Sequence, residues 1–316
     1  MRSLGRLLTF SFFLVSCQAP AQAPQEAPTR TRTEEPQALP KQRPTDSGGA
    51  KGSFVSLPQA SSLVAIGDLH GDLEQTRKVL RLAGAIDESD HWRGGKLVVV
   101  QTGDEIDRGD DDRAVLDLME RLKGEANAAG GAVIAMSGNH ELMNVVQDFR
   151  YVTPGSVAAF DSAGGRLEAF RPGGPYARML ADRPVVVQVG DTVFAHGGVL
   201  MKHVRYGLKR MNDEVRAFLL GQRPDLSPVV MAEDGPVWTR VYSGVPTPAC
   251  EELGQVLGAL GAKRMVVGHT VQPEGVNAAC DGRVWRIDVG LSRHYGGPVQ
   301  ALRIEKGEAK RLSDAN

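Results

Sequence analysis

The chain has 316 residues, with 37 Lys and Arg against 38 Asp and Glu, so its formal net charge at pH 7 is −1. This balance offers no excess of positive charge for contacts with a phosphate backbone, and we expect no nucleic-acid partner. Hydrophobic residues make up 41% and charged residues 24%, which is ordinary for a globular chain of this length. No apolar run reaches the roughly 20 residues of a membrane-spanning helix.

The first residues predict an export signal. Two arginines precede an apolar stretch at residues 7–15, which is too short to cross a bilayer as a mature helix. The next residues resemble the lipobox of bacterial lipoproteins: Leu14-Val15-Ser16-Cys17. The resemblance implies cleavage of a signal peptide, residues 1–16, and a lipid on Cys17 as the only link to a membrane. Gln18 is similar to outer-membrane signals, so we expect a lipoprotein of the bacterial cell envelope, anchored in the outer membrane; in an ordinary signal peptide Cys17 would be incidental.

A proline-rich segment follows the cysteine. Seven of the 18 prolines fall within residues 18–58, and residues 18–53 contain one Leu and no Val, Ile, Met or aromatic residue. Such a composition cannot bury enough apolar surface to offset the entropy lost on ordering. We therefore expect a lipidated, disordered tether over residues 17–53 and one globular domain over residues 54–316.

Short apolar runs then alternate with helical patterns. Buried strands are predicted at residues 63–66, 96–101 and 132–136, and helices between them at residues 73–83 and 111–129. A Gly-Asp pair at residues 190–191 predicts a hairpin of two strands, 185–189 and 192–195. Later strands are predicted at residues 264–267, 284–287 and 299–304. This alternation indicates the α/β class, a layered sheet covered by helices.

Five of these strands end in a glycine-containing corner that carries Asp, Asn or His. Ligands bind at the carboxyl ends of strands in an α/β sheet, so we expect these side chains to meet. Four of the seven histidines lie in the corners. The corners are Gly67-Asp68-Leu69-His70, Gly103-Asp104, Gly138-Asn139-His140, His196-Gly197 and Gly268-His269.

Mixed Asp, Asn and His ligands suit two divalent cations of borderline softness, Mn, Fe or Zn, about 3.5–4 Å apart. A bridging carboxylate can hold both cations, and Asp104 is the candidate. Such a pair would lower the pKa of a shared water and clamp a phosphoryl group during in-line attack. Since no Ser or Cys stands in a comparable corner, direct attack by a dimetal-bound hydroxide is the simpler mechanism.

The corners resemble the motifs of the calcineurin-like metallophosphoesterase superfamily, in its phosphoprotein phosphatase (PPP) type. Four further segments are similar to the Shewanella-like protein phosphatases: residues 138–144, 148–152, 235–240 and 295–297. The resemblance spans about residues 64–297. It implies a layered metallophosphoesterase-type sandwich of mixed β-sheets flanked by α-helices.

The resemblance also implies a role for each site residue. The ligands of one metal would be Asp68, His70 and Asp104, and those of the other Asp104, Asn139, His196 and His269.

The remaining site residues would act on the substrate. His140 would protonate the leaving oxygen, oriented by Asp107, because a carboxylate fixes an imidazole and favours its protonated form. Arg108 would bind the substrate phosphate through its several donors. Arg240 is a second candidate for phosphate binding, with a surface salt bridge as the alternative, and Tyr295 could contact the substrate or its leaving group.

Three features outside the corners bear on the function. Residues 148–180 hold five of the 14 Phe and Tyr, which predicts a lid insertion over the substrate or a helical subdomain with its own core; Arg150 is a candidate substrate contact there. Cys250 and Cys280 could pair in an oxidising periplasm or remain free thiols. His91 and His203 have polar neighbours, and we expect both to be solvated.

We therefore expect a monomeric, metal-dependent phosphoprotein phosphatase that hydrolyses Ser/Thr or Tyr phosphomonoesters of a phosphoprotein or phosphopeptide. One alternative is hydrolysis of nucleotide polyphosphates such as dinucleoside tetraphosphates. Another is a non-catalytic lipoprotein that uses the fold as a binding scaffold. That reading predicts a damaged ligand set, whereas all the expected ligands are present.

Overall fold

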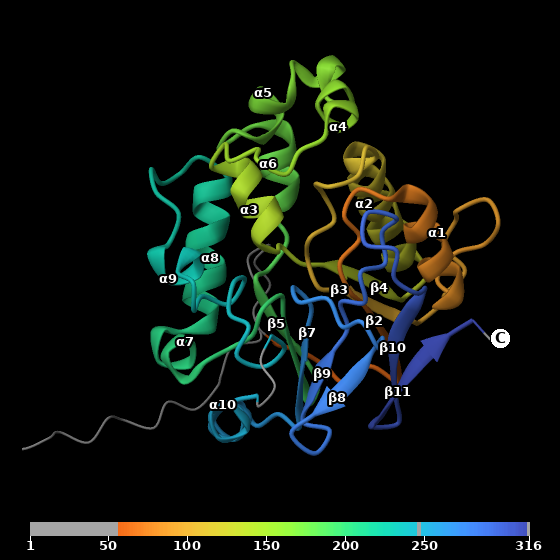
Figure 1. Ribbon diagram of the computed structural model, residues 1–316, viewed down its shortest axis with the longest axis vertical. Helices are drawn as coiled ribbons and strands as arrows, with labels where there is room; N and C mark the ends of the chain where they lie inside the picture. Colours follow the sequence, from red (N-terminus) through yellow and green to blue (C-terminus); the bar gives the residue numbers. More distant parts are fainter. Residues whose placement is uncertain (1–55, 245–247, 315–316) are drawn as a thin grey trace, which may run out of the picture. The chain divides into compact units, whose positions relative to one another are not determined.

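The computed structural model describes residues 56–244 and 248–314, which belong to one compact unit, 50–316. The predicted signal peptide, the lipidated Cys17 and the tether lie outside the described residues. Two mixed β-sheets form the centre and helices flank them (Figure 1). This confirms the predicted α/β class. Among the described residues, every helix is too short or too polar to cross a membrane.

One sheet has five strands in the order β11-β10-β2-β3-β4. Its three parallel strands are β2 (Ser62–Ile66), β3 (Val98–Gln101) and β4 (Ala132–Ala135). The antiparallel strands β10 (Gln300–Glu305) and β11 (Glu308–Ser313) complete it. Helices α1 (Leu73–Leu82) and α2 (Asp112–Ala128) follow β2 and β3, and their apolar side chains pack in the same core as this sheet.

The other sheet has six strands in the order β1-β5-β6-β7-β9-β8. Its strands are β1 (Ser56–Leu57), β5 (Val186–Val189), β6 (Thr192–Ala195), β7 (Arg264–Val267), β8 (Asn277–Ala279) and β9 (Val284–Arg286). Strands β6, β7 and β9 run parallel, whereas β5 and β6 form the predicted antiparallel hairpin.

The remaining helices precede or follow the hairpin in the chain. Those before it are α3 (Asn139–Val145), α4 (Pro154–Ala158), η1 (Asp161–Ala163), α5 (Arg166–Phe170) and α6 (Pro175–Leu180). Those after it are α7 (Met201–Tyr206), α8 (Leu208–Leu219), α9 (Pro228–Met231) and α10 (Cys250–Leu260).

Strands of the six-stranded sheet are buried on both faces. In the hairpin, Val187 and Phe194 pack in the core shared with the five-stranded sheet, whereas Val186 and Val193 pack in a second core with α8 and α10. Successive side chains of a strand point to opposite faces, so near-continuous apolar runs serve two cores at once. The predicted strands and first two helices are confirmed to within one or two residues, but the sequence reading missed the helices between residues 201 and 260.

The segment predicted as a lid or a helical subdomain contains α4, α5 and α6. Its aromatic rings pack edge to face, with centroids 5.1 Å apart for Phe160 and Phe170 and 4.9 Å apart for Phe160 and Tyr176. All three side chains belong to the second core. The segment is therefore a helical subdomain, but its aromatic side chains join the second core instead of forming a core of their own.

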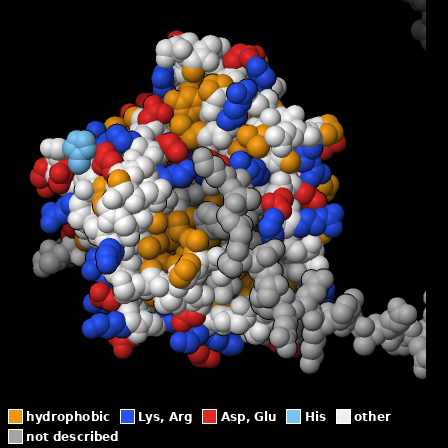
Figure 2. Space-filling model, turned by 180° about the vertical axis from the view of Figure 1, so that it is seen from behind, with side chains coloured by type: hydrophobic (Ala, Val, Ile, Leu, Met, Phe, Trp, Pro, Cys, Tyr) orange, Lys and Arg blue, Asp and Glu red, His pale blue; other side chains and the backbone are white. Residues whose placement is uncertain are grey.

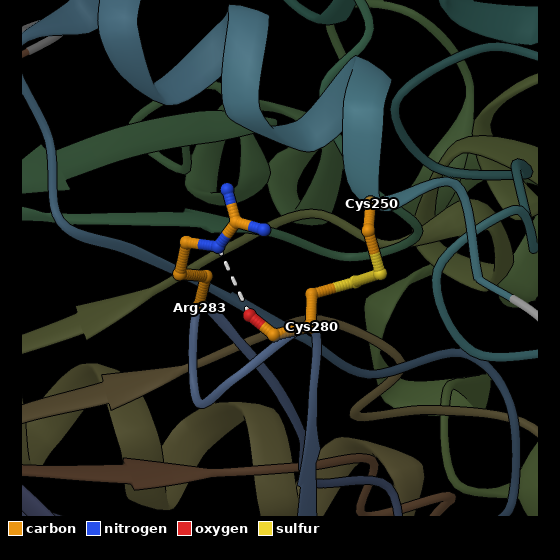
Figure 3. Close-up of a disulfide and its surroundings, with 3 residues drawn as sticks. All are labelled: Cys250, Cys280 and Arg283. Atoms are coloured by element: carbon orange, nitrogen blue, oxygen red, sulfur yellow. Dashed lines mark hydrogen bonds between the residues drawn. A yellow bond between two sulfur atoms is a disulfide. The ribbon is translucent and has the colours of Figure 1, made fainter.

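Cys250 and Cys280 form a disulfide, with an S–S distance of 1.93 Å and a Cα–Cα distance of 5.3 Å (Figure 3). Of the two alternatives, a disulfide or two free thiols, the structure shows the disulfide. Cys250 begins α10 and Cys280 directly follows β8, so the disulfide links the helix to the β8–β9 hairpin. The Nε of Arg283 donates to the carbonyl of Cys280 at 3.0 Å and braces the same turn (Figure 3).

The face opposite to the one seen in Figure 1 carries side chains of both charges (Figure 2). Lys and Arg side chains are interspersed with Asp and Glu around the rim, and hydrophobic side chains gather near the centre (Figure 2). The described part of this face presents no broad basic area, as the near-neutral net charge leads one to expect.

Candidate active site

The five corners converge at the carboxyl ends of β2, β3, β4, β6 and β7, as predicted. Several residues in these corners or within four positions after them have a left-handed backbone, although they are not glycines. The φ angles are +46° for His70, +59° for Asp104, +70° for Asp107, +69° for Arg108 and +66° for His269. Such angles cost a non-glycine residue about 1–3 kcal/mol, and they cluster at functional sites.

Glycines let the corners approach one another closely. A Cβ on Gly138 would collide with the Asp104 carboxylate, and one on Gly268 would lie 2.5 Å from Asp68 Oδ1. The corner sequences therefore need glycine for space.

The ring nitrogens of His196 and His269 face one another. His196 Nδ1 lies 3.0 Å from the carbonyl oxygen of Thr102, and His269 Nε2 lies 3.0 Å from that of Trp238. Since a carbonyl only accepts, those nitrogens carry the protons, and the other ring nitrogens present lone pairs. His196 Nε2 lies 2.9 Å from Asn139 Oδ1, 3.1 Å from Asp104 Oδ2 and 3.1 Å from His269 Nδ1. Four acceptor atoms thus converge, an arrangement that fits a bound cation.

Asp104 also belongs to a second group of potential ligands. The ligand atoms of Asp104, His196 and His269 lie within 4.8 Å of one another, and so do those of Asp104, His70 and His140. Asp68 Oδ2 lies 3.9 Å from His70 Nε2. Asp104 is therefore the carboxylate common to both groups, at the position predicted for a bridge.

The environment sets the charge of these ligands. Burial lowers the pKa of His70 to about 3 and that of His269 to about 2, so both rings are neutral near pH 7, as coordination requires. Burial alone would raise the pKa of Asp104, but His196 and His140 hold it well below the ordinary value. Burial, Asp288 and Asp104 raise the pKa of Asp68. The buried negative charge would be relieved by a cation.

His140 and Asp107 form a buried pair beside this centre. His140 Nδ1 lies 2.7 Å from Asp107 Oδ2, and the backbone N–H of His140 donates to Asp104 Oδ1 at 3.0 Å. Burial alone would lower the pKa of His140, but Asp104 and Asp107 raise it above its ordinary value. The ring is thus oriented by a carboxylate and biased toward its charged form, which suits a proton donor.

Glu141 holds two corners together. Its carboxylate accepts from the backbone N–H groups of Asp104 at 2.8 Å, Glu105 at 2.8 Å and Gly138 at 2.7 Å. Burial and the nearby Asp104 raise the pKa of Glu141 to about 7. The three accepted bonds fix the β3 and β4 corners relative to each other.

Arg108 lies between two aromatic rings. Its Cζ is 4.4 Å from the centroid of Tyr151 and 5.5 Å from that of Tyr295. Tyr295 lies beside the ligands, with its ring centroid 5.3 Å from that of His70. The rings restrict the guanidinium by cation–π contact and leave its donors for an anion.

The structure places the other two predicted arginines differently. Arg240 Nη1 donates to the His269 carbonyl and to Thr270 Oγ1, both at 2.8 Å, so it lies at the edge of the ligand cluster. Arg150 pairs with Asp148 at 2.7 Å and its side chain is 65% exposed. Arg150 is not brought against the ligands.

Comparison with known proteins identifies the family. The sequence profile of the calcineurin-like phosphoesterases matches residues 61–273. The chain belongs to this family. It is 37% identical over 303 residues to Shewanella-like protein phosphatase 2 of Arabidopsis thaliana, covering 80% of this chain and 78% of the plant protein. It is 33% identical over 272 residues to Shewanella-like protein phosphatase 1 of Plasmodium berghei, covering 81% and 75%. The predicted resemblance is confirmed.

Solved structures agree with this assignment. A cold-active protein-tyrosine phosphatase of a psychrophilic Shewanella species superposes with a TM-score of 0.75 at 26% identity, over 83% of this chain and 80% of that one. A protein serine/threonine phosphatase of Saccharomyces cerevisiae shares the fold, with a TM-score of 0.61 at 15% identity. The chain is thus a phosphoesterase, a hydrolase, and its family implies divalent metal ions at the ligand groups described above.

Several residues of the phosphoesterase site escaped the sequence reading. Asp288 follows β9 and lies near Asp68, and burial raises its own pKa to about 6. Tyr151 lies within residues 148–152, which resemble the Shewanella-like phosphatases, and its ring centroid lies 5.1 Å from that of His140. Arg166 lies in the segment predicted as a lid or a helical subdomain, and its side chain is buried against Asp107.

Two predictions about the remaining histidines have opposite outcomes. The side chain of His91 is 63% exposed, as predicted. The prediction that His203 is solvated is wrong: His203 is fully buried, and its Nδ1 accepts from the backbone N–H of Leu200 at 3.0 Å. That nitrogen satisfies the first turn of α7, a capping role that polar neighbours in the sequence do not reveal.

Proposed function

We propose that this phosphoesterase is a phosphoprotein phosphatase that uses two divalent cations and hydrolyses its substrate by direct attack of water. The observation that carries the proposal is the convergence of acceptor atoms on Asp104 beside the buried His140–Asp107 pair. Metal-assisted hydrolysis needs both parts, a site for cations and a donor for the leaving group.

The ligand assignment keeps Asp104 in both metal sites. Beside His70 it takes Asp68, whose Oδ2 lies 3.9 Å from His70 Nε2, rather than His140, which is kept as the proton donor. One cation would be held by Asp68, His70 and Asp104, and the other by Asp104, Asn139, His196 and His269. Bound there, Mn, Fe or Zn ions would activate water and neutralise charge on the phosphoryl oxygens.

The chain's own side chains would complete the reaction. His140 donates a proton to the leaving oxygen, and Asp107 accepts from its Nδ1 and fixes the ring. Arg108, restrained between two tyrosine rings, offers donors to the phosphate oxygens. Arg240 lies close enough to the ligands to assist. Arg150 acts only if it leaves Asp148, and we expect it to contribute least.

We favour phosphotyrosine over phosphoserine and phosphothreonine as the residue hydrolysed. Tyr151 and Tyr295 are 36% and 39% exposed and flank Arg108, so an aromatic leaving group would find ring faces to pack against. The similar Shewanella enzyme is described as a protein-tyrosine phosphatase.

A substrate panel tests the proposal. Phosphotyrosine and phosphothreonine peptides of one sequence are compared with diadenosine tetraphosphate in the presence of Mn²⁺. We expect the highest kcat/KM with the phosphotyrosine peptide. Preference for the dinucleotide would favour the nucleotide polyphosphate hydrolase instead, and a lack of turnover of all three would favour the non-catalytic scaffold.

We also propose that the enzyme works in the bacterial cell envelope, attached through a lipid on Cys17. The residues around Cys17 resemble a lipobox, and the Cys250–Cys280 disulfide is typical of exported proteins. Labelling with a fatty acid should occur in the full chain and vanish in Cys17→Ser, which should leave the membrane fraction. Equal labelling of both proteins would contradict the anchor.

A further inference from the structure

We propose that Arg166 is a positioning residue for the reaction: it holds the Asp107 carboxylate so that His140 faces the leaving oxygen in one orientation. The inference rests on the proposed function, since it assigns Arg166 a part in proton donation by His140. Arg166 begins α5, in the segment predicted as a lid or a helical subdomain, far from any corner in the sequence.

Every nitrogen of the buried Arg166 guanidinium has a partner. Nη2 donates to Asp107 Oδ1 at 3.1 Å and to Asp112 Oδ2 at 2.7 Å. Nε donates to Asn144 Oδ1 at 2.8 Å, and Nη1 donates to Ser156 Oγ at 2.6 Å. The side chain is only 3% exposed. A planar fork with all donors used has one orientation.

Besides Asp107 itself, two of these partners, Asn144 and Asp112, also form hydrogen bonds with Asp107. Asn144 Nδ2 donates to Asp107 Oδ1 at 3.0 Å and Oδ2 at 3.1 Å, and to the His140 carbonyl at 2.9 Å. The backbone N–H of Asp107 donates to Asp112 Oδ1 at 2.9 Å. Arg166 thus ties together the groups that fix Asp107 from its side chain and from its backbone.

Aromatic rings hold Arg166 in turn. Its Cζ lies 5.0 Å from the centroids of both Phe160 and Phe170, which are fully buried. The guanidinium is therefore also held by the aromatic rings of the helical subdomain. This gives the subdomain a direct connection to the His140–Asp107 pair.

A purely structural role is the competing account, and another arginine provides its control. Arg113 Nη1 donates to the Ala159 carbonyl at 3.1 Å and to Ser162 Oγ, so it also fastens this segment to α2. The contacts of Arg113 with Ala159, Ser162 and Asp117 involve neither Asp107 nor His140. If Arg166 only docked the segment, its loss would resemble the loss of Arg113.

The two accounts differ in how the rate loss depends on the leaving group. Phenyl phosphate needs protonation of its leaving oxygen more than p-nitrophenyl phosphate does, because phenol is the weaker acid. We therefore compare kcat on both esters for the wild type, Arg166→Met, Arg113→Met and His140→Ala, each with its folding checked by circular dichroism. We expect Arg166→Met to lose at least tenfold more on phenyl phosphate than on p-nitrophenyl phosphate, in the direction shown by His140→Ala. Arg113→Met should lose equally on both.

A double variant tests the route of the effect. In His140→Ala, adding Arg166→Met should change kcat on phenyl phosphate less than threefold, because residues that act through one group are not additive. If Arg166→Met does not fold, Arg166→Lys carries the same tests, since one ammonium cannot hold Asp107, Asp112 and Asn144 together.

The outcomes separate this inference from the function on which it rests. Equal losses of Arg166→Met on the two esters, or losses that multiply with those of His140→Ala, would overturn the positioning role while leaving the phosphatase intact. A wild type that hydrolyses neither ester would overturn the proposed function and the positioning role with it.

Discussion

Replacement of Asp107 by Asn changes the charge of one buried group while keeping its size. Arg166 Nη2 and Asn144 Nδ2 both donate to Asp107 Oδ1, and His140 Nδ1 faces Oδ2 at 2.7 Å. The carboxamide of Asp107→Asn would keep its oxygen toward the two donors and turn its NH₂ toward His140. The Nδ1 atom would then have to accept, and the doubly protonated ring that donates a proton would no longer be favoured.

The expected loss is that of general acid catalysis. Such catalysis is typically worth about 10²–10⁴-fold, or about 2.7–5.4 kcal/mol of transition-state free energy at about 1.36 kcal/mol per factor of ten. We expect kcat of Asp107→Asn on phenyl phosphate to fall by that factor, measured at pH 7 with equal metal content in both proteins. The control is Asp110→Asn, an exposed loop residue that accepts from Thr153 Oγ1 at 2.6 Å. A kcat for Asp107→Asn within tenfold of the wild type would refute the reasoning about His140.

Three further predictions concern stability and substrate binding. Burial and Lys202 lower the pKa of His203 from 6.5 to about 4. Between these two pH values the His203 ring is protonated in the unfolded chain but neutral in the folded chain, so the folded state loses stability as the pH falls. The wild type should therefore lose about 1.4 kcal/mol more unfolding free energy than His203→Asn between pH 7.5 and 5.5 in urea titrations, and equal losses would contradict this. Replacing Cys250 and Cys280 by Ser removes a disulfide of sequence separation 30. The free energy of unfolding should fall by about 3–4 kcal/mol, and an unchanged melting temperature would contradict this prediction. Arg108→Lys should lower kcat/KM for a phosphopeptide by about 10–100-fold through the lost guanidinium donors, whereas a change below threefold would remove Arg108 from phosphate binding.

The convergence of the corners could be predicted because it follows from local rules. Each corner comes directly after a short apolar run, and parallel strands present their carboxyl ends at one edge of a sheet. Asp68, Asp104 and His269 could thus be placed near one another before any coordinates. Gly138 and Gly268 marked the close approaches, since a side chain at either position would collide with a ligand carboxylate.

Residues that join the site from distant segments could not be predicted in this way. Arg166 is 59 positions from Asp107, and nothing in its own neighbourhood distinguishes it from the other arginines of residues 148–180. Asp288 follows a three-residue strand, β9, whose apolar signal is brief. Tertiary packing alone decides which of these polar side chains point inward.

The helices between residues 201 and 260 were missed for a different reason. Met211, Val215 and Phe218 of α8 recur at helical spacing, but α7 and α9 have only six and four residues and α10 contains two glycines. Short helices gain most of their stability from packing rather than from propensity. Their existence therefore depends on the six-stranded sheet against which they pack.

The central claim is that two cations gather around Asp104. Elemental analysis of the purified protein, loaded with Mn²⁺ and freed of loose metal, tests it most directly when paired with p-nitrophenyl phosphate turnover, using Asp110→Asn as the matched control. The account predicts two metal ions per chain in the wild type and the control, and fewer than one ion with no measurable turnover in Asp104→Asn. Full metal content and full activity in Asp104→Asn would contradict it.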